Sequence, residues 1–259
     1  MVTSRAGAPP VEHPVAPLPP IGSLSRSVTL FRAFQVEQSD PACFYRLLAA
    51  DSARELSRFA DLDGAHVLDV GGGPGYFADA FAAAGAHYGA VDADAGELAA
   101  AGRPGTNTLL ASGLNLPVAD GAVDVCFSSN VLEHVPDPER MGEEMLRVTR
   151  PGGTVVLSWT TWFSPWGGHE TSPWHYLGGR RAADRYARRH GRRPKNDVGR
   201  TLFPTHAGPM LAWARSQAGA DLVAAYPRYH PWWLRWVAHV PAVREVAVWN
   251  LVLVLRVRR

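Results

Sequence analysis

The chain has 259 residues, of which 46% are hydrophobic and 19% charged, and its formal net charge is +2 at pH 7. This is a globular composition, long enough for one generous domain or a domain with a cap, and the weak charge argues against a nucleic-acid-binding protein. Two cysteines cannot form a disulfide framework, and no apolar run reaches the roughly 18 residues of a membrane span. We therefore expect a cytoplasmic protein without a signal peptide.

The N-terminal stretch is the first predicted unit. Residues 1–25, which include "APPVEHPVAPLPPIGS", have no helical or strand period and are predicted to be a disordered, proline-rich tail. Over residues 40–62, apolar side chains recur at helical spacing after an Asp-Pro cap signal. This pattern predicts a helix that leads into the main domain, residues 26–259.

Residues 65–160 alternate short apolar runs with helical segments, which is the βαβ pattern of a parallel sheet. Strands are predicted at residues 65–70, 87–92, 106–112, 122–129, 153–159, 220–226 and 248–257. Helices are predicted at residues 75–84, 95–101 and 137–149, with a short one starting near Asn130. Residues 161–215 and 227–245 interrupt the rhythm and are expected to form a cap.

A glycine-rich loop, "VLDVGGGPGYF" at residues 67–77, follows the first of these strands. Gly71, Gly73 and Gly75 stand between a strand and a helix N-terminus, where backbone N–H groups surround a ligand that a Cβ would obstruct. A tight turn without a ligand is the plain alternative. The nicotinamide fingerprint G-x-G-x-x-G is the rival, but it needs a glycine where Tyr76 or Ala78 stands.

Two acids refine the ligand class. Asp69 precedes the loop and would repel a pyrophosphate, but it suits a ligand with an ammonium group, such as S-adenosylmethionine. Asp92 ends the next strand, in "YGAVDAD", and its carboxylate could accept both hydroxyls of a ribose. The alternative for Asp92 is a helix N-cap, a role for which Asp94 is better placed.

Four stretches together resemble the class I S-adenosylmethionine-dependent methyltransferases of the type 11 group: "VLDVGGGPGYF", "GAVDAD", "LPVADGAVDVCFSSNVLEHVPDPE" and "EMLRVTRPGGTVVLSW". Weaker similarity over "GGHETSPWHYLGG" and "PRYHPWW" points to actinobacterial members. The resemblance implies a Rossmann-like α/β fold: a doubly wound, mostly parallel seven-stranded sheet with an inserted cap. It also implies S-adenosylmethionine as cofactor.

The resemblance further implies a role for individual residues. The three loop glycines would wrap the methionine end of the cofactor, Asp92 would hold the ribose, and Ala93 would touch the adenine. Ser112, with Gly113 beside it, stands where many members have an Asp that binds the adenine amino group. Ser129 and Asn130, after the fourth strand, would face the methionine and the methyl group.

Methyl transfer to a hydroxyl benefits from a general base near the ends of the fourth and fifth strands. His134, in "NVLEHV", is one candidate. The others lie in "WGGHETSPWHYLGG", where His169, Glu170 and His175 supply imidazole and carboxylate groups. The same residue types bind divalent metals, but without a spacing such as HxH or HExxH we expect no metal site.

Two surface features bear on the acceptor. Residues 180–200 hold nine Arg and Lys against two Asp, with Arg181, Arg185, Arg188 and Arg192 at helical spacing. In "YPRYHPWWLRWVAHVP", Trp232, Trp233, Trp236, Val237 and Val240 fall on one helical face. The simple explanations are that the arginines form the solvated face of a helix and that the aromatic residues pack against the cap. Together the two features favour an amphipathic acceptor, with peripheral contact of the tryptophans to the inner face of the membrane.

The sequence as a whole predicts methyl transfer to a small-molecule or lipid-like acceptor, with a hydroxyl of a sugar, glycolipid or secondary metabolite as the expected target. The alternatives are a non-catalytic scaffold that binds S-adenosylmethionine and a nicotinamide-dependent oxidoreductase. Nothing in the sequence indicates the oligomeric state.

Overall fold

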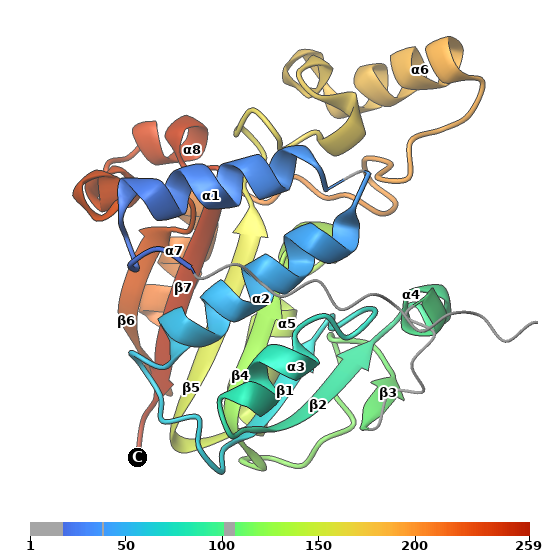
Figure 1. The fold of residues 1–259 in the computed structure, drawn as a ribbon. Coiled ribbons are helices and arrows are strands. Elements are labelled where there is room, and N and C mark those ends of the chain that lie inside the picture. The colour runs from blue at the N-terminus through green and yellow to red at the C-terminus, as the bar shows by residue number, and fades with distance from the viewer. Residues whose placement is uncertain (1–17, 38, 101–106) are drawn as a thin grey trace, which may run out of the picture.

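A seven-stranded sheet is the centre of the computed structural model, which describes residues 18–37, 39–100 and 107–259 (Figure 1). Its strand order is β3-β2-β1-β4-β5-β7-β6. The strands are β1 His66–Val70, β2 His87–Asp92, β3 Thr108–Leu110, β4 Val123–Ser129, β5 Thr149–Thr160, β6 Ala220–Pro227 and β7 Asn250–Val257. β7 is antiparallel to both neighbours, and the pairs among β1 to β5 are parallel. The predicted sheet is thus confirmed.

The helices are α1 Leu24–Gln35, α2 Pro41–Leu56, α3 Ala78–Ala83, α4 Ala95–Ala100, α5 Pro138–Val148, α6 Gly179–His190, α7 Ala207–Ser216 and α8 Val243–Ala247. Short 3₁₀ helices are η1 Leu132–His134, η2 His169–Thr171, η3 Trp174–Leu177 and η4 Trp232–His239. Acid-Pro signals start two helices: Asp40 accepts the Cys43 N–H at the start of α2, and Asp137 accepts the Arg140 N–H at the start of α5. No helix in the described part of the chain is long and apolar enough to cross a membrane.

Each face of the sheet has its own apolar core. Phe44 and Leu48 of α2 and Phe81 of α3 pack on one face, against Val67 and Phe127 of the strands. α5 and α7 cover the other face, with Met141, Met145, Met210 and Leu211 fully or almost fully buried. The molecule is therefore a three-layer sandwich, the doubly wound arrangement that the βαβ pattern predicts.

The structure moves two expected boundaries. α1 begins at Leu24, inside the stretch expected to be a tail, because the Ser23 side chain caps the helix by accepting the Arg26 N–H. Residues 1–17 of the expected tail lie outside the described residues. So do residue 101 of the expected helix 95–101 and residue 106 of the expected strand 106–112. α7 falls within the range expected for the cap, yet it packs on the sheet. The inserted part that rises beyond the strand ends is η2, η3 and α6 (Figure 1).

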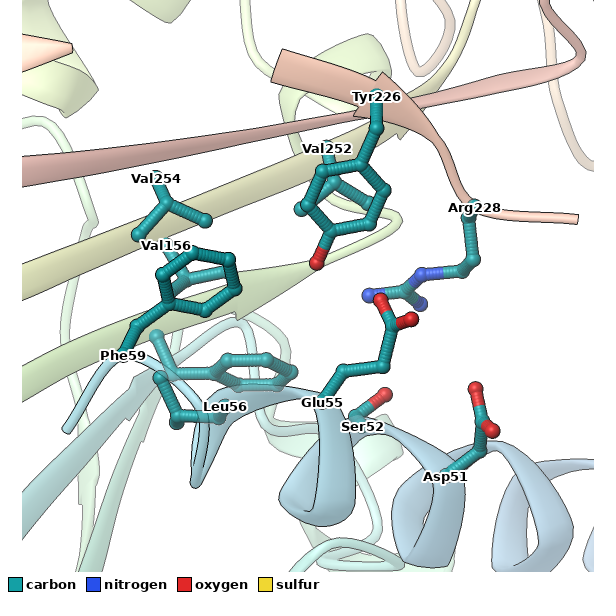
Figure 2. Close-up of a pocket in the computed structure, with 11 residues that line it drawn as sticks. Asp51, Ser52, Glu55, Leu56, Phe59, Val156, Tyr226, Arg228, Val252 and Val254 are labelled. Atoms are coloured by element: carbon teal, nitrogen blue, oxygen red, sulfur yellow. The ribbon is translucent and has the colours of Figure 1, made fainter. Parts of the chain in front are cut away.

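A buried group of charges ties α1 and α2 to the sheet. Arg26 is completely buried and donates to both carboxylate oxygens of Asp51, at 2.7 and 2.5 Å, and to the backbone oxygen of Arg228. Glu55 of α2 pairs with Arg235 at 2.8 Å. Figure 2 shows Glu55, Tyr226 and Arg228 pointing into one space between α2 and the sheet, a cavity of about 10 Å³, which is room for one water molecule.

Candidate active site

The glycine loop joins β1 to α3 in a left-handed path. Gly71, Gly73 and Gly75 have φ values of +82°, +48° and +77°, which side chains other than glycine rarely adopt. A Cβ on Gly71 would lie 2.3 Å from Cγ2 of Val131. A Cβ on Gly75 would meet no described atom within 4 Å. Gly71 is therefore required by packing, and Gly75 leaves open space above the loop.

Asp69 lies beneath this loop. It is 1% exposed, and its Oδ2 accepts the Tyr88 hydroxyl at 2.8 Å. Burial, more than any neighbour, raises the pKa of this carboxyl to about 7. The Asp69 carboxylate is thus held by Tyr88 of β2, and its contact with the ammonium group of the cofactor stays a prediction.

Asp92 ties the end of β2 to the loop. Its Oδ2 accepts the Gly73 N–H and its Oδ1 accepts the Asp94 N–H, each at 2.8 Å. Asp94 instead accepts the Gly96 and Glu97 N–H groups at the start of α4, so the helix-cap role belongs to it. Asp92 remains half-buried, and because a carboxylate has about four acceptor positions, two are left for ribose hydroxyls. Ala93 is exposed beside it.

Ser112 and Gly113 follow β3. Ser112 is exposed, and its hydroxyl accepts the Leu114 N–H at 3.2 Å. A Cβ on Gly113 would lie 3.0 Å from Cγ1 of Val70, at the end of β1. Both residues therefore stand at the same edge of the sheet as the glycine loop.

Ser129 and Asn130, at the end of β4, are held by two polar residues that the sequence interpretation missed. Arg228 is buried and donates to the Ser129 hydroxyl at 2.8 Å. Asn250 donates to Oδ1 of Asn130 at 2.7 Å, while Asn130 itself has a φ of +59°. Arg228 directly follows β6 and Asn250 begins β7, about 100 residues further along the chain, so no local pattern signals them.

Aromatic residues of the N-terminal helices approach the loop from above. Tyr45 of α2 stacks on Tyr76, which follows Gly75, with ring centroids 5.4 Å apart and planes inclined by 4°. The Tyr45 hydroxyl donates to Glu37 at 2.8 Å, and burial raises the pKa of both groups. α1 and α2 thus cover the cofactor side of the sheet edge.

The loop and the strand ends fit S-adenosylmethionine. Open space lies over Gly75, Asp92 keeps free acceptor positions, and Ser112, Ser129 and Asn130 follow the ends of β3 and β4 at the same edge of the sheet. Crevices outside the carboxyl ends of parallel strands are where doubly wound sheets bind ligands. Bound there, the cofactor supplies an electrophilic methyl group on a sulfonium.

The four proposed catalytic residues do not lie together. His134 on η1 and His169 on η2 meet, with ring centroids 5.2 Å apart, and the buried Glu133 joins them. His175 is buried elsewhere, against Gly168 and the Trp162 ring. Glu170 accepts from Asn196 at 3.0 Å and lines a pocket under α6. The structure therefore keeps two of the four candidates in one cluster and adds Glu133, which sequence reasoning missed.

The pocket under α6 has a volume of about 150 Å³. Arg185 and Arg189 line it together with the aromatic rings of Trp174 and Tyr186, and the Arg185 guanidinium lies 3.9 Å above the Trp174 ring. The expected basic stripe is shorter than predicted. α6 ends at His190 with Gly191 at a φ of +67°, so Arg192 lies beyond the helix.

The tryptophan face also differs from its predicted form. Trp232, Trp233 and Trp236 are 71%, 51% and 56% exposed, whereas Val237 is buried in the core. The segment is the 3₁₀ helix η4, whose period of about three residues places Trp233 and Trp236 on one side and turns Val237 to another.

Comparisons with known proteins agree with this geometry. Residues 68–157 match the type 11 family described as a methyltransferase domain. An S-adenosylmethionine-dependent methyltransferase from Mesorhizobium loti has a similar fold, with a TM-score of 0.54 at 19% identity over 82% of this chain and 97% of that chain. The fold and its strand-end site define a Rossmann-like class I methyltransferase.

Mycobacterial relatives place the chain more closely. An uncharacterised methyltransferase of Mycobacterium sp. strain KMS is 56% identical over 245 residues, covering 90% of this chain and 95% of that protein. One from Mycobacteroides abscessus is 53% identical over 249 residues, covering 91% and 95%. The chain belongs to this family, and it is a methyltransferase that uses S-adenosylmethionine. The nicotinamide alternative is thereby set aside.

Proposed function

We propose that the protein methylates a hydroxyl group of a small-molecule or lipid-like acceptor, such as a sugar, a glycolipid or a secondary metabolite. The observation that carries this proposal is the cluster of Glu133, His134 and His169 just beyond the end of β4, beside Ser129 and Asn130. A hydroxyl is a weak nucleophile until its proton is removed, and imidazole and carboxylate groups are suited to accept that proton.

In this reaction the acceptor oxygen would form a bond to the methyl carbon, and the bond from that carbon to sulfur would break with its electron pair staying on sulfur. The acceptor proton would pass to an imidazole or carboxylate group of the cluster. This chain's contribution is to align the acceptor and to activate its hydroxyl at the cluster. Alignment alone corresponds to effective molarities on the order of 10⁵–10⁸ M.

Two surface features support an amphipathic acceptor. The tryptophans of η4 are exposed, and the pocket under α6 combines arginines with aromatic rings. η2 connects this pocket with the cluster, since it contributes Glu170 and Thr171 to the pocket and His169 to the cluster. We propose that the apolar part of the acceptor reaches the protein from a membrane surface.

The test uses the purified protein, methyl-labelled cofactor and an extract of a mycobacterium. Label in the organic phase supports a lipid-like acceptor, and label in aqueous low-mass material supports a sugar or soluble metabolite. Mass spectrometry of the product then distinguishes a methyl ether from a methylamine. Label on precipitated macromolecules, or a methylamine, would contradict the proposal. Asp92→Ala, which removes the ribose carboxylate, is the control that should abolish labelling.

A further inference from the structure

Glu133, His134 and His169 come from two separate parts of the chain. The first two lie on η1 after β4, and His169 lies on η2 in the cap. One donor atom of each residue lies within 4.8 Å of the donor atoms of the other two. The cap therefore completes a group of three ligand-type side chains at the cofactor edge of the sheet.

The carboxylate of Glu133 is buried with one oxygen unpartnered in the described part of the chain, and it gives the strongest indication of a bound cation. It is 1% exposed, and its Oε1 accepts the Thr160 N–H at 2.9 Å. Within the described residues its Oε2 is buried without a hydrogen-bond partner, and no Arg or Lys forms an ion pair with it. A buried carboxylate costs several kcal/mol unless a cation or hydrogen-bond donors compensate its charge.

Each of the two imidazoles has a ring nitrogen available as a ligand. The Nδ1 of His134 lies 2.7 Å from the Thr201 backbone oxygen, so it carries the proton and leaves the Nε2 lone pair free. A backbone carbonyl that orients a histidine in this way is typical of metal ligands. The His169 Nε2 is buried and has no partner in the part of the chain described here.

We propose that Glu133, His134 and His169 bind one divalent transition-metal ion of the Zn²⁺ or Mn²⁺ kind. Two imidazoles and one carboxylate suit these ions, whereas Mg²⁺ and Ca²⁺ prefer sites made of oxygen ligands. Ligand bonds of about 2.0–2.2 Å require donors roughly 3–3.5 Å apart, which small side-chain rotations provide from the present spacing. The expectation that no metal binds rested on local spacing, and local spacing does not register ligands that come from two separate segments.

Three protein ligands leave coordination positions open. With an ion bound, the three side chains act as ligands instead of bases. An acceptor hydroxyl at an open position would then lose its proton to water more readily, because the ion stabilises the alkoxide oxygen. This use of the ion rests on the proposed hydroxyl methylation. Binding of the ion does not, since it requires only the three side chains.

The test measures metal binding without cofactor or acceptor, so its outcome is independent of the methylation assay. Chelator-treated, full-length protein is titrated with Mn²⁺, and free Mn²⁺ is followed by electron paramagnetic resonance. We expect saturation at one ion per chain and displacement by Zn²⁺. Glu133→Gln and His169→Gln should each weaken binding at least 10-fold, as loss of a ligand or its supporting partner does elsewhere.

The matched control is His239→Gln, which removes an exposed histidine outside the cluster and should leave the affinity unchanged. Circular dichroism checks the fold of each variant, and His169→Gln carries the test if Glu133→Gln does not fold. Absence of saturable Mn²⁺ and Zn²⁺ binding up to about 1 mM would overturn the proposal. Binding that both cluster variants leave unchanged would also overturn it.

Discussion

Gly71 and Gly75 share a backbone conformation but serve different purposes. Both have positive φ values, yet a Cβ would collide with Val131 only at Gly71. Glycine is therefore needed at position 71 because the loop packs closely against the segment after β4. Position 75 faces open space, and we expect the cofactor to bind there.

Substitution by alanine should separate these two purposes. Gly71→Ala should lower the free energy of unfolding by about 2 kcal/mol or more, through backbone strain and overpacking. Gly75→Ala should cost about 1–2 kcal/mol of stability and weaken S-adenosylhomocysteine binding at least 10-fold. Urea unfolding and calorimetric titration measure the two quantities.

Gly199→Ala is the matched control for strain, because Gly199 has a φ of +82° and a Cβ there would meet no described atom within 4 Å. Gly199→Ala should lose as much stability as Gly75→Ala and should bind S-adenosylhomocysteine as tightly as the parent protein. Equal affinities of Gly75→Ala and the parent would show that the space above the loop is not the cofactor site.

Asp69 predicts a pH dependence of stability. Its pKa is raised from 3.8 to about 7 in the folded protein, so between these values the native state holds a proton that the unfolded state has released. Stability contributed by this group is present below about pH 4 and is lost as the pH rises to 7, with a slope approaching 1.4 kcal/mol per pH unit. Asp69→Asn should remove this slope.

The measurement compares urea unfolding of the parent and Asp69→Asn at several pH values from 4 to 7. Taking the difference cancels the opposite trend of His169, whose pKa burial lowers to about 3. A stability difference that does not change with pH would contradict the raised pKa of Asp69. Asp61→Asn, at an exposed acid outside the site, is the control.

Local patterns predicted the part of the site that is contiguous in sequence. The glycine loop and Asp92 each follow a strand directly, so strand periodicity alone places them at one edge of the sheet. Glu133, Arg228 and Asn250 escaped prediction because their partners lie on other elements. In the sequence, Glu133 next to His134 looks like an ordinary residue of a short helix. The cluster becomes visible only in the fold, where the cap places His169 beside them.

At the scale of elements, the buried charges decide how the N-terminal helices sit on the sheet. Arg26 of α1 binds Asp51 of α2 and the backbone at the end of β6, so one side chain connects three elements. α2 in turn carries Tyr45, which stacks on the residue after the glycine loop. The position of α2 over the glycine loop thus depends on the buried Arg26.

Arg26→Met should lower the free energy of unfolding by about 3–5 kcal/mol, because it leaves Asp51 buried without its main cationic partner. Equilibrium unfolding in urea measures the loss. Arg32→Met, an exposed change on the same helix, should alter stability by less than about 0.5 kcal/mol. A loss for Arg26→Met no larger than that of Arg32→Met would mean that the buried pair contributes no stability.

α1 and η4 were the elements that sequence patterns described least well. The proline-rich composition before α1 concealed a helix whose stability comes from Arg26 and from packing on α2. In η4, apolar residues at spacings compatible with an α-helix form a 3₁₀ helix, because Val237 and Ala238 enter the core while the tryptophans turn outward. Tertiary packing outweighed local periodicity in both cases.

The whole sheet, by contrast, followed from its pattern. Short apolar runs alternating with helices permit few arrangements other than a doubly wound sheet, and the strand boundaries lie close to their predicted positions. The inserted cap has no such repeat. Its 3₁₀ helices are held by contacts among glycines and aromatic side chains, and these residues do not recur at a regular spacing that would predict a helix.

The exposed tryptophans of η4 predict membrane association of the whole molecule. The parent protein should sediment with phosphatidylglycerol vesicles, and the triple variant Trp232→Ala, Trp233→Ala, Trp236→Ala should bind at least 10-fold more weakly, since aromatic side chains anchor proteins at the lipid interface. Leu177→Ala, at another exposed apolar residue, is the control. Vesicle binding that the triple variant retains would contradict this role.

The strand order also constrains how the molecule assembles during synthesis. β6 is made before β7, but among the strands that the structure describes it pairs with β7 alone, which lies between β6 and β5. Until the ribosome has delivered β7, β6 has nowhere to pair, and α7 has only part of the surface it covers. The nascent chain therefore passes through a stage with a free strand edge, when chaperone binding or mispairing with another chain competes with folding.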